Sequence, residues 1–366
     1  MSIVKKIGKF LGILILVLIV LLVITLISTT ILHKVKHKSN LEFLEEQGFY
    51  NPVSVGDHSL NLIEYGGSEN GYRIIGLGGN GGGFPLELRE LAEELKEEGK
   101  VYYLARAGYD GSDDVEDEMT VKFVVEDYRK ALKTAGIEAP YVLMPHSYAG
   151  LLASYWVSKY PDEIEAMVNL DGIVVQQISD EQIQEAADES SGLKIMKTIM
   201  NLGIGDVFPG MFAMQYPEFS EDEQRIYNAM NIMTMSSNAF ISEIGCAASS
   251  INDTYDMIQP NNVPKLYISA ENGYQTVEEM KAADVLSEYS INELTKDFEG
   301  SEEERIEKAY EINFEEMEKF KKEKMIPYIE KLGNCEIANL PGSHFIYEEK
   351  PQECAEIIKE FLGSIK

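Results

Sequence analysis

A single serine, Ser147, stands where a short apolar run changes into an amphipathic one. Residues 141–144 (Tyr-Val-Leu-Met) have the composition of a buried strand, and the apolar residues of 151–159 recur at helical spacing. Residues 145–149 (Pro-His-Ser-Tyr-Ala) lie between them and follow the pattern small, any, serine, any, small. A chain that passes from strand to helix in so few residues must reverse at the serine, which leaves the hydroxyl exposed above the sheet. Glycine is more usual at both flanks, so Pro145 and Ala149 make this a loosened form of the pattern.

The neighbouring segments alternate between strand and helix patterns. Strand patterns occupy residues 72–77, 101–105 and 166–170, and helical spacing occupies residues 86–98 and 119–135. A strand pair at residues 53–63 opens this region, and strands at 264–270 and 335–340 and a helix at 351–365 close it. Such alternation predicts an α/β fold with a mostly parallel central sheet and helices on both faces.

The alternation is interrupted by two insertions. Residues from about 173 to 263 are helical or irregular and predict a helical cap. Residues from about 273 to 332 form a charged helical insertion, in which Ser301 and Glu304 have the spacing of a capping box. The cap is rich in methionine, which most simply indicates helical core but also suits an adaptable pocket wall for a lipid-like acyl substrate. These methionines are Met196, Met200, Met211, Met214, Met230, Met233 and Met235.

The N-terminal region predicts a membrane anchor. After a short tail, residues 1–9, no charged residue occurs in residues 10–32, and these 23 residues would span roughly 34 Å as a helix. The run is long for a cleaved signal peptide and has no solvent face for a soluble helix. Lysines flank both ends and do not decide the orientation. We expect a single-pass protein of the cell membrane with a juxtamembrane linker at 33–49 and an extracytoplasmic domain at 50–366.

Charge excludes one class of partner. The chain has 62 acidic and 32 basic side chains and a formal net charge of −30, which would repel nucleic acid. Three cysteines are too few and too scattered for a disulfide framework or a zinc cluster. The glycine-rich residues 78–83 lack the Lys-Ser/Thr ending of a phosphate-binding loop. We therefore expect no nucleic acid partner, metal or organic cofactor, and a small-molecule substrate.

The serine needs a base, and exclusion points to His344. A serine hydroxyl is a weak nucleophile at neutral pH unless a base lies within hydrogen-bond reach. Of the five histidines, two flank the anchor, His58 lies in an early strand or turn, and His146 adjoins the serine, where neighbouring side chains diverge. His344 follows the last strand, in a loop that can fold over the carboxyl edge of the sheet.

Two carboxylates are candidates for the residue that orients His344. Asp171 ends the strand after the Ser147 helix, and Glu271 ends the next strand. Residues 104–171 resemble the α/β-hydrolase fold family, with residues 108–112 (Gly-Tyr-Asp-Gly-Ser) as a loosened form of its loop after the fourth strand. The resemblance covers most of residues 50–365 outside the two insertions. Members usually place the acid after the seventh strand, where Gly273 falls here with Glu271 two positions early. Other members place an aspartate after the sixth strand, so the resemblance favours Asp171 with Glu271 as the alternative.

The resemblance also implies an oxyanion hole, a pair of backbone N–H groups that stabilise negative charge on the reacting carbonyl. Tyr148, the residue after the serine, would supply one N–H. Gly79 or Asn80 would supply the second, from the loop in which the family's usual His-Gly is replaced by glycine-rich sequence. These residues predict a membrane-anchored serine hydrolase that cleaves an ester, thioester or amide through an acyl-enzyme on Ser147. The alternatives are an acyltransferase and a non-catalytic, surface-tethered binding module on the same fold.

Overall fold

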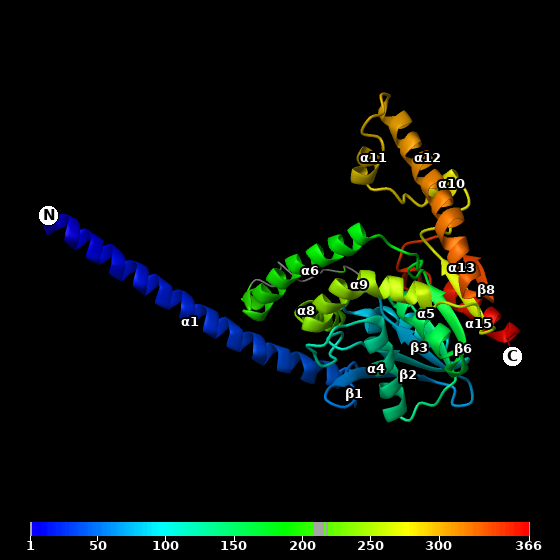
Figure 1. The fold of residues 1–366 in the computed structure, drawn as a ribbon, viewed down its shortest axis with the longest axis horizontal. Helices are drawn as coiled ribbons and strands as arrows, with labels where there is room; N and C mark the ends of the chain where they lie inside the picture. Colours follow the sequence, from blue (N-terminus) through cyan, green and yellow to red (C-terminus); the bar gives the residue numbers. More distant parts are fainter. Residues whose placement is uncertain (1, 208–215, 217–218, 366) are drawn as a thin grey trace.

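The computed structural model describes residues 2–207, 216 and 219–365. The domain is built on a central eight-stranded sheet (Figure 1). The strand order is β1-β2-β4-β3-β5-β6-β7-β8. β2 pairs antiparallel with β1 and β4, and all the other neighbours are parallel. The predicted α/β fold is therefore confirmed. The strands are β1 (Pro52–Ser54), β2 (Ser59–Gly67), β3 (Tyr72–Leu77), β4 (Gly99–Leu104), β5 (Tyr141–Pro145), β6 (Ile164–Leu170), β7 (Lys265–Ser269) and β8 (Cys335–Asn339).

Helices cover both faces of the sheet because successive strand residues point to opposite sides. Ile74 belongs to one core cluster together with Leu91 and Leu362 of the helices on that face. Its neighbour Ile75 belongs to the other cluster, together with Val125 and Leu152. The first face carries α2 (Phe84–Glu87), α3 (Arg89–Glu94), α14 (Ile346–Glu349) and α15 (Pro351–Ser364), and the second carries α4 (Val121–Thr134) and α5 (Ala149–Lys159). The short η1 (Pro161–Glu163) connects α5 to β6.

The parallel strands bring the predicted site residues to one edge of the sheet. Leu77 at the end of β3 is in register with Pro145 of β5, and Leu170 of β6 is in register with Ile268 of β7. Ser269 in turn pairs with Asn339 of β8. Gly79, Ser147, Asp171, Glu271 and His344 follow these strands, so they share the carboxyl edge, where ligands bind in sheets of this type.

The cap insertion is helical, as expected. It consists of α6 (Asp180–Asn201), α7 (Ile204–Val207), α8 (Glu221–Met235) and α9 (Asn238–Met257). Met230 and Met233 are buried in the core cluster of the first face, whereas Met211 and Met214 lie outside the described residues. Most of the described cap methionines are buried or half-buried, which agrees with the simpler, helical-core interpretation.

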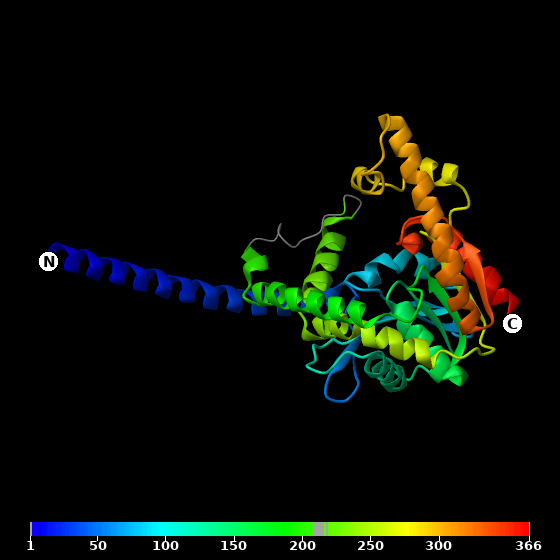
Figure 2. The same cartoon turned by 45° about the horizontal axis from the view of Figure 1, so that its top comes forward.

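The second insertion forms an arm that projects from the body (Figure 2). It contains α10 (Val277–Ala282), α11 (Glu288–Leu294) and α12 (Glu302–Phe320), which continues through the π-helical η3 (Lys321–Met325) into α13 (Ile326–Leu332). The predicted capping box is confirmed, because Ser301 accepts a hydrogen bond from the Glu304 N–H and the Glu304 side chain accepts one from the Ser301 N–H. Tyr274, Met280, Tyr310 and Met317 form a separate small core within the arm.

The N-terminal helix α1 (Ser2–Glu46) extends away from the body as a single rod (Figure 1). Its length and composition suffice to cross a bilayer, and no part of its most apolar 18-residue window is buried. The helix also includes most of the predicted linker at 33–49, which is a correction. No glycine or proline occurs between Gly12 and Gly48, so nothing in the backbone stops the helix earlier. Phe43 and Leu44 are buried in the core, so the packed domain begins before residue 50.

The C-terminal end of the apolar run contacts the cap. The Thr29 hydroxyl donates to the Leu202 carbonyl (2.5 Å), and His33 Nδ1 lies 2.8 Å from an Asp206 carboxylate oxygen. Lys36 Nζ donates to the Asp206 backbone carbonyl (2.9 Å). These contacts attach the helix to the end of α6 and to α7.

Candidate active site

Ser147 occupies the sharp turn that its sequence predicts. Its φ of 53° lies in the left-handed region, which is unusual for any residue except glycine. β5 ends at Pro145 and α5 begins at Ala149, and the His146 N–H donates to the Leu77 carbonyl at 3.0 Å, which ties the turn to β3. A Cβ on Gly79 would lie 2.7 Å from Ser147 Cβ, so only glycine permits this close approach of the β3 loop. Tight packing from the neighbouring loop thus holds the strained backbone in place.

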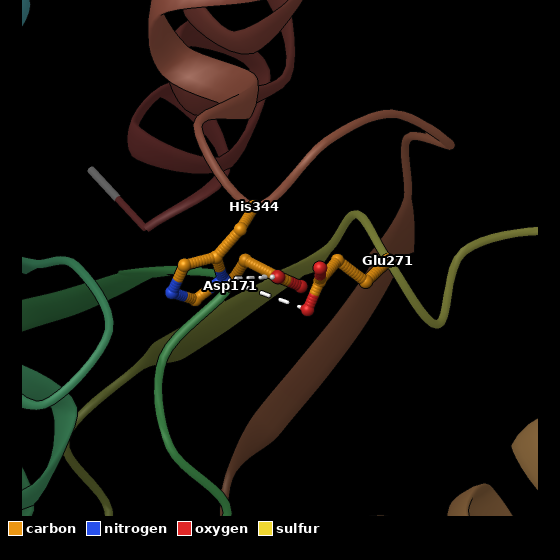
Figure 3. A group of neighbouring side chains, drawn as sticks. All are labelled: Asp171, Glu271 and His344. Carbon is orange, nitrogen blue, oxygen red and sulfur yellow. Dashed lines mark hydrogen bonds and ion pairs between the residues drawn. The ribbon is translucent and has the colours of Figure 1, made fainter. Parts of the chain in front are cut away.

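Asp171 and His344 are joined by a hydrogen bond at the same edge. His344 Nδ1 lies 2.9 Å from Asp171 Oδ2, and a carboxylate only accepts, so Nδ1 carries the proton. Figure 3 shows the second ring nitrogen on the far side of the ring, away from both neighbouring carboxylates. The hydrogen bond to Asp171 raises the pKa of His344 above its ordinary value. This pairing leaves Nε2 free of Asp171, as a general base requires.

Asp171 is fixed on both of its carboxylate oxygens. It is 5% exposed, and Oδ1 accepts the Ala270 N–H at 2.8 Å while Oδ2 binds His344. The alternative acid, Glu271, lies 3.8 Å from His344 Nδ1, and its side chain is 61% exposed. Partial burial, with the nearby Asp171 charge, raises the pKa of Glu271. Distance and burial both favour Asp171 as the partner of His344.

These three side chains also present a possible cation site. Asp171, Glu271 and His344 offer ligand atoms that all lie within 4.8 Å of one another (Figure 3). A metal bound to Nδ1 would require that nitrogen without its proton, whereas the 2.9 Å contact to Asp171 is an ordinary N–H to carboxylate hydrogen bond. The donor set fits a proton-transfer pair better than a metal centre.

The predicted oxyanion donors, Tyr148 with Gly79 or Asn80, have unused N–H groups. Among the described residues, the backbone N–H of Tyr148 and that of Gly79 donate to no protein acceptor, and both residues are buried. Unsatisfied N–H groups are rare in buried backbone and often serve a ligand. The Asn80 N–H also has no acceptor within the described chain, but Asn80 is exposed. The loop and the turn therefore present donors of the kind that an oxyanion hole needs.

His146 has a structural position that the sequence did not predict. Its buried Nε2 donates to the backbone carbonyl of His344 at 2.9 Å, and the Tyr347 hydroxyl lies 3.4 Å from its Nδ1. Burial, with the charge of His344, lowers the pKa of His146 to about 3, so the ring is neutral. His146 is therefore no base for Ser147 but ties the His344 loop to the serine turn. The only sequence signal was its place beside Ser147.

The serine hydroxyl and the His344 ring line one cavity. In the described part of the chain Ser147 Oγ has no hydrogen-bond partner, but Ser147, Asp171 and His344 all line a cavity of about 410 Å³. Hydrogen bonds between a nucleophile and its base are often loose until a substrate binds. Ile173, Val174, Ile178, Ile251 and Phe320 form the apolar part of the wall. None of the described cap methionines lines it, and Met211 and Met214 lie outside the described residues.

Comparisons with known proteins agree with this architecture. A family model described as alpha/beta hydrolase fold matches residues 73–316. The chain is 24% identical over 326 residues to the uncharacterized protein YbdG of Bacillus subtilis (strain 168), a match covering 86% of each chain.

Solved structures show the same fold at low identity. The haloalkane dehalogenase DatA from Agrobacterium tumefaciens C58 is 15% identical with a TM-score of 0.56, over 86% of this chain and 96% of that one. The epoxide hydrolase CorEH is 14% identical with a TM-score of 0.56, over 87% of this chain and 99% of that one. The family match covers most of the chain, from β3 to α12. The chain therefore belongs to the α/β-hydrolase fold family.

Proposed function

We propose that the protein is a serine hydrolase that cleaves an ester, thioester or amide through an acyl-enzyme on Ser147. The observation that carries the proposal is the Asp171–His344 hydrogen bond of 2.9 Å on the cavity that Ser147 lines. The left-handed turn at Ser147 and the unused N–H groups beside it support the same chemistry. The family match adds support for hydrolysis, since this fold hosts many hydrolases.

In the proposed reaction, Ser147 Oγ attacks the substrate carbonyl while His344 Nε2 accepts the hydroxyl proton. Asp171 holds the ring by Nδ1 and stabilises the imidazolium that forms. The N–H groups of Tyr148 and of Gly79 or Asn80 donate to the oxyanion of the tetrahedral intermediate. His344 then protonates the leaving group, and water, deprotonated by His344, releases the acid from Ser147.

We propose further that α1 anchors this enzyme in the cell membrane, with the globular domain outside the cytoplasm. The most apolar window of α1 has a mean hydropathy of 3.5 and is wholly exposed, which would be costly in water. The aliphatic wall formed by Ile173, Val174, Ile178 and Ile251 suits the acyl chain of a lipid-like substrate.

A fluorophosphonate probe tests the hydrolase proposal, because it labels a serine only when a base and oxyanion donors activate it. Wild-type protein in membranes should label, and Ser147→Ala should abolish the labelling. Ser249→Ala is the matched control, since Ser249 is an exposed cap serine that bonds only the nearby Cys246 carbonyl. Absent labelling in the wild type, or equal labelling of Ser147→Ala, would reject the proposal in favour of a non-catalytic binding module.

A further inference from the structure

Arg106 binds the loop that carries the proposed oxyanion donors. It follows β4 and is 2% exposed. Its Nη1 donates to the Gly78 carbonyl at 2.6 Å and its Nη2 to the Gly79 carbonyl at 2.8 Å. The planar guanidinium thereby fixes the orientation of two successive peptide groups, which a single point charge such as lysine cannot do as well.

Fixing these two carbonyls also fixes two N–H groups. The Gly78 carbonyl belongs to the same peptide group as the Gly79 N–H, and the Gly79 carbonyl to the same group as the Asn80 N–H. Carbonyl and N–H point in opposite directions across a trans peptide. The described chain has one cis peptide, Ala139-Pro140, so both of these groups are trans. The N–H groups of Gly79 and Asn80 therefore point away from Arg106.

The sheet order places Ser147 on the side to which these N–H groups point. β3 lies between β4, which leads to Arg106, and β5, which leads to Ser147. The β3 loop is thus held between them, with its carbonyls against Arg106. On the other side, a Cβ on Gly79 would lie 3.2 Å from Ser147 Oγ. The N–H groups of the loop accordingly face the serine, where a substrate oxyanion would form.

The cap holds Arg106 from the opposite side. Arg106 Nε lies 2.9 Å from Glu243 Oε1 of α9, and both side chains are 1% exposed. The guanidinium also lies over the Tyr109 ring, 3.8 Å from its centroid, and 5.8 Å from that of Tyr148. The Tyr109 hydroxyl donates to Glu243. This buried cation is neutralised and hydrogen-bonded, which is the condition for a stable charge in the interior.

We propose that Arg106 is a positioning residue that presets the oxyanion hole, and that Glu243 makes the cap part of this support. The inference rests on the proposed function of Ser147. Because Arg106 binds the carbonyl side of the loop, a glycine-rich loop without the family's usual His-Gly can still orient its N–H donors. The positive charge near the two carbonyls also polarises their peptide groups and strengthens their N–H groups as donors.

The test separates oxyanion stabilisation from binding and from folding. Arg106→Met should lower kcat for a p-nitrophenyl ester about 100-fold with KM changed less than about threefold, because oxyanion donors act on the transition state. The affinity for a trifluoromethyl ketone, whose adduct with serine carries an oxyanion, should fall by the same factor as kcat/KM. The pH midpoint of the rate should not move, since His344 and Asp171 are untouched.

The double variant Arg106→Met/Glu243→Leu removes both members of the charge pair and leaves no unpaired buried charge. It is assayed in the same way if the Arg106→Met variant does not fold. Arg129→Met is the matched control: Arg129 is also paired with glutamates, Glu126 and Glu163, on α4 and η1 away from the site. A folded double variant with kcat within about threefold of wild type would overturn the inference. Absent Ser147-dependent labelling in the wild type would instead reject the function on which the inference depends.

Discussion

Asp171 uses its two carboxylate oxygens for different purposes. One accepts the Ala270 N–H and fixes the carboxylate against β7, and the other holds His344 at Nδ1. The aspartate therefore sets both the direction and the tautomer of the imidazole. A ring held in this way presents Nε2 to the cavity without any loss of side-chain freedom at the moment of reaction.

We expect Asp171→Asn to lower kcat by about 10²- to 10⁴-fold, because an amide can stabilise the wrong tautomer and cannot neutralise the imidazolium. The pH dependence should shift as well. His344 acts as a base only when neutral, so the rate rises as pH rises through its pKa, which Asp171 raises. Removing the charge should move that rise to lower pH. A pH–rate profile of each protein checks both effects.

Glu271→Gln is the matched variant at the second carboxylate. Glu271 adds a smaller upward effect on the pKa of His344, and its carboxylate lies 3.8 Å from Nδ1, beyond hydrogen-bond distance. We expect kcat within about threefold of wild type and a small shift of the rate profile to lower pH. A loss for Glu271→Gln as large as that for Asp171→Asn would reverse the assignment of the acid.

Candidate site residues could be predicted from the sequence where they directly follow a predicted strand, because the strand then fixes their position in the fold. The proximity of Asp171 and His344 could be predicted because each follows a recognisable strand, and parallel strands end at one edge. Arg106 was not recognised, because its partners Gly78 and Glu243 lie 28 and 137 positions away in the sequence. A buried arginine looks like any other arginine until its acceptors are known.

At the scale of elements, the end of α1 belongs to the globular domain. The lysine-rich residues 33–38 suggested a polar linker, but Phe43 and Leu44 pack into the core, and the Phe49 N–H caps the helix by donating to the Leu44 carbonyl at 2.7 Å. A few apolar residues scattered in a polar stretch are too weak a signal to shift a domain boundary. Helix continuation was instead decided by the absence of glycine and proline.

Truncation checks this boundary. A chain that begins at residue 33 should keep the stability of the domain, because Phe43 and Leu44 stay in place. A chain that begins at residue 50 should lose about 3–6 kcal/mol of unfolding free energy, since two large apolar side chains are removed from the core at about 1.5–3 kcal/mol each. Urea unfolding of the two chains measures the difference. Equal midpoints would show that the two side chains contribute nothing.

The cap illustrates why element content is easier to predict than pocket lining. Its helical character follows from spacing, but which helix face meets the cavity depends on tertiary packing. The buried Met230 and Met233 fill the core, and the described wall near Ser147 is aliphatic and aromatic instead. Burial and pocket lining call for the same apolar residues, so composition cannot separate them.

At the scale of the whole molecule, helix α1 contacts the cap of the domain that carries the proposed active site. The full chain should stay with the membrane pellet after carbonate extraction, whereas a chain beginning at residue 33 should be released, because the exposed apolar residues of 10–32 are gone. The shorter chain should still label with the fluorophosphonate probe. Release of the full chain by carbonate would contradict the proposed anchor, and sizing the N-terminus would identify a cleaved leader.

The continuity of α1 has a geometric consequence. A flexible tether lets an enzyme search a hemisphere whose radius grows with tether length. A continuous helix of 45 residues that contacts α7 through Asp206 leaves the domain less freedom than such a tether would. An active site held in this way would stay within a narrow range of distances from the lipid surface. Its encounters would be set by lateral diffusion of the anchor and by how far a substrate stands above the bilayer.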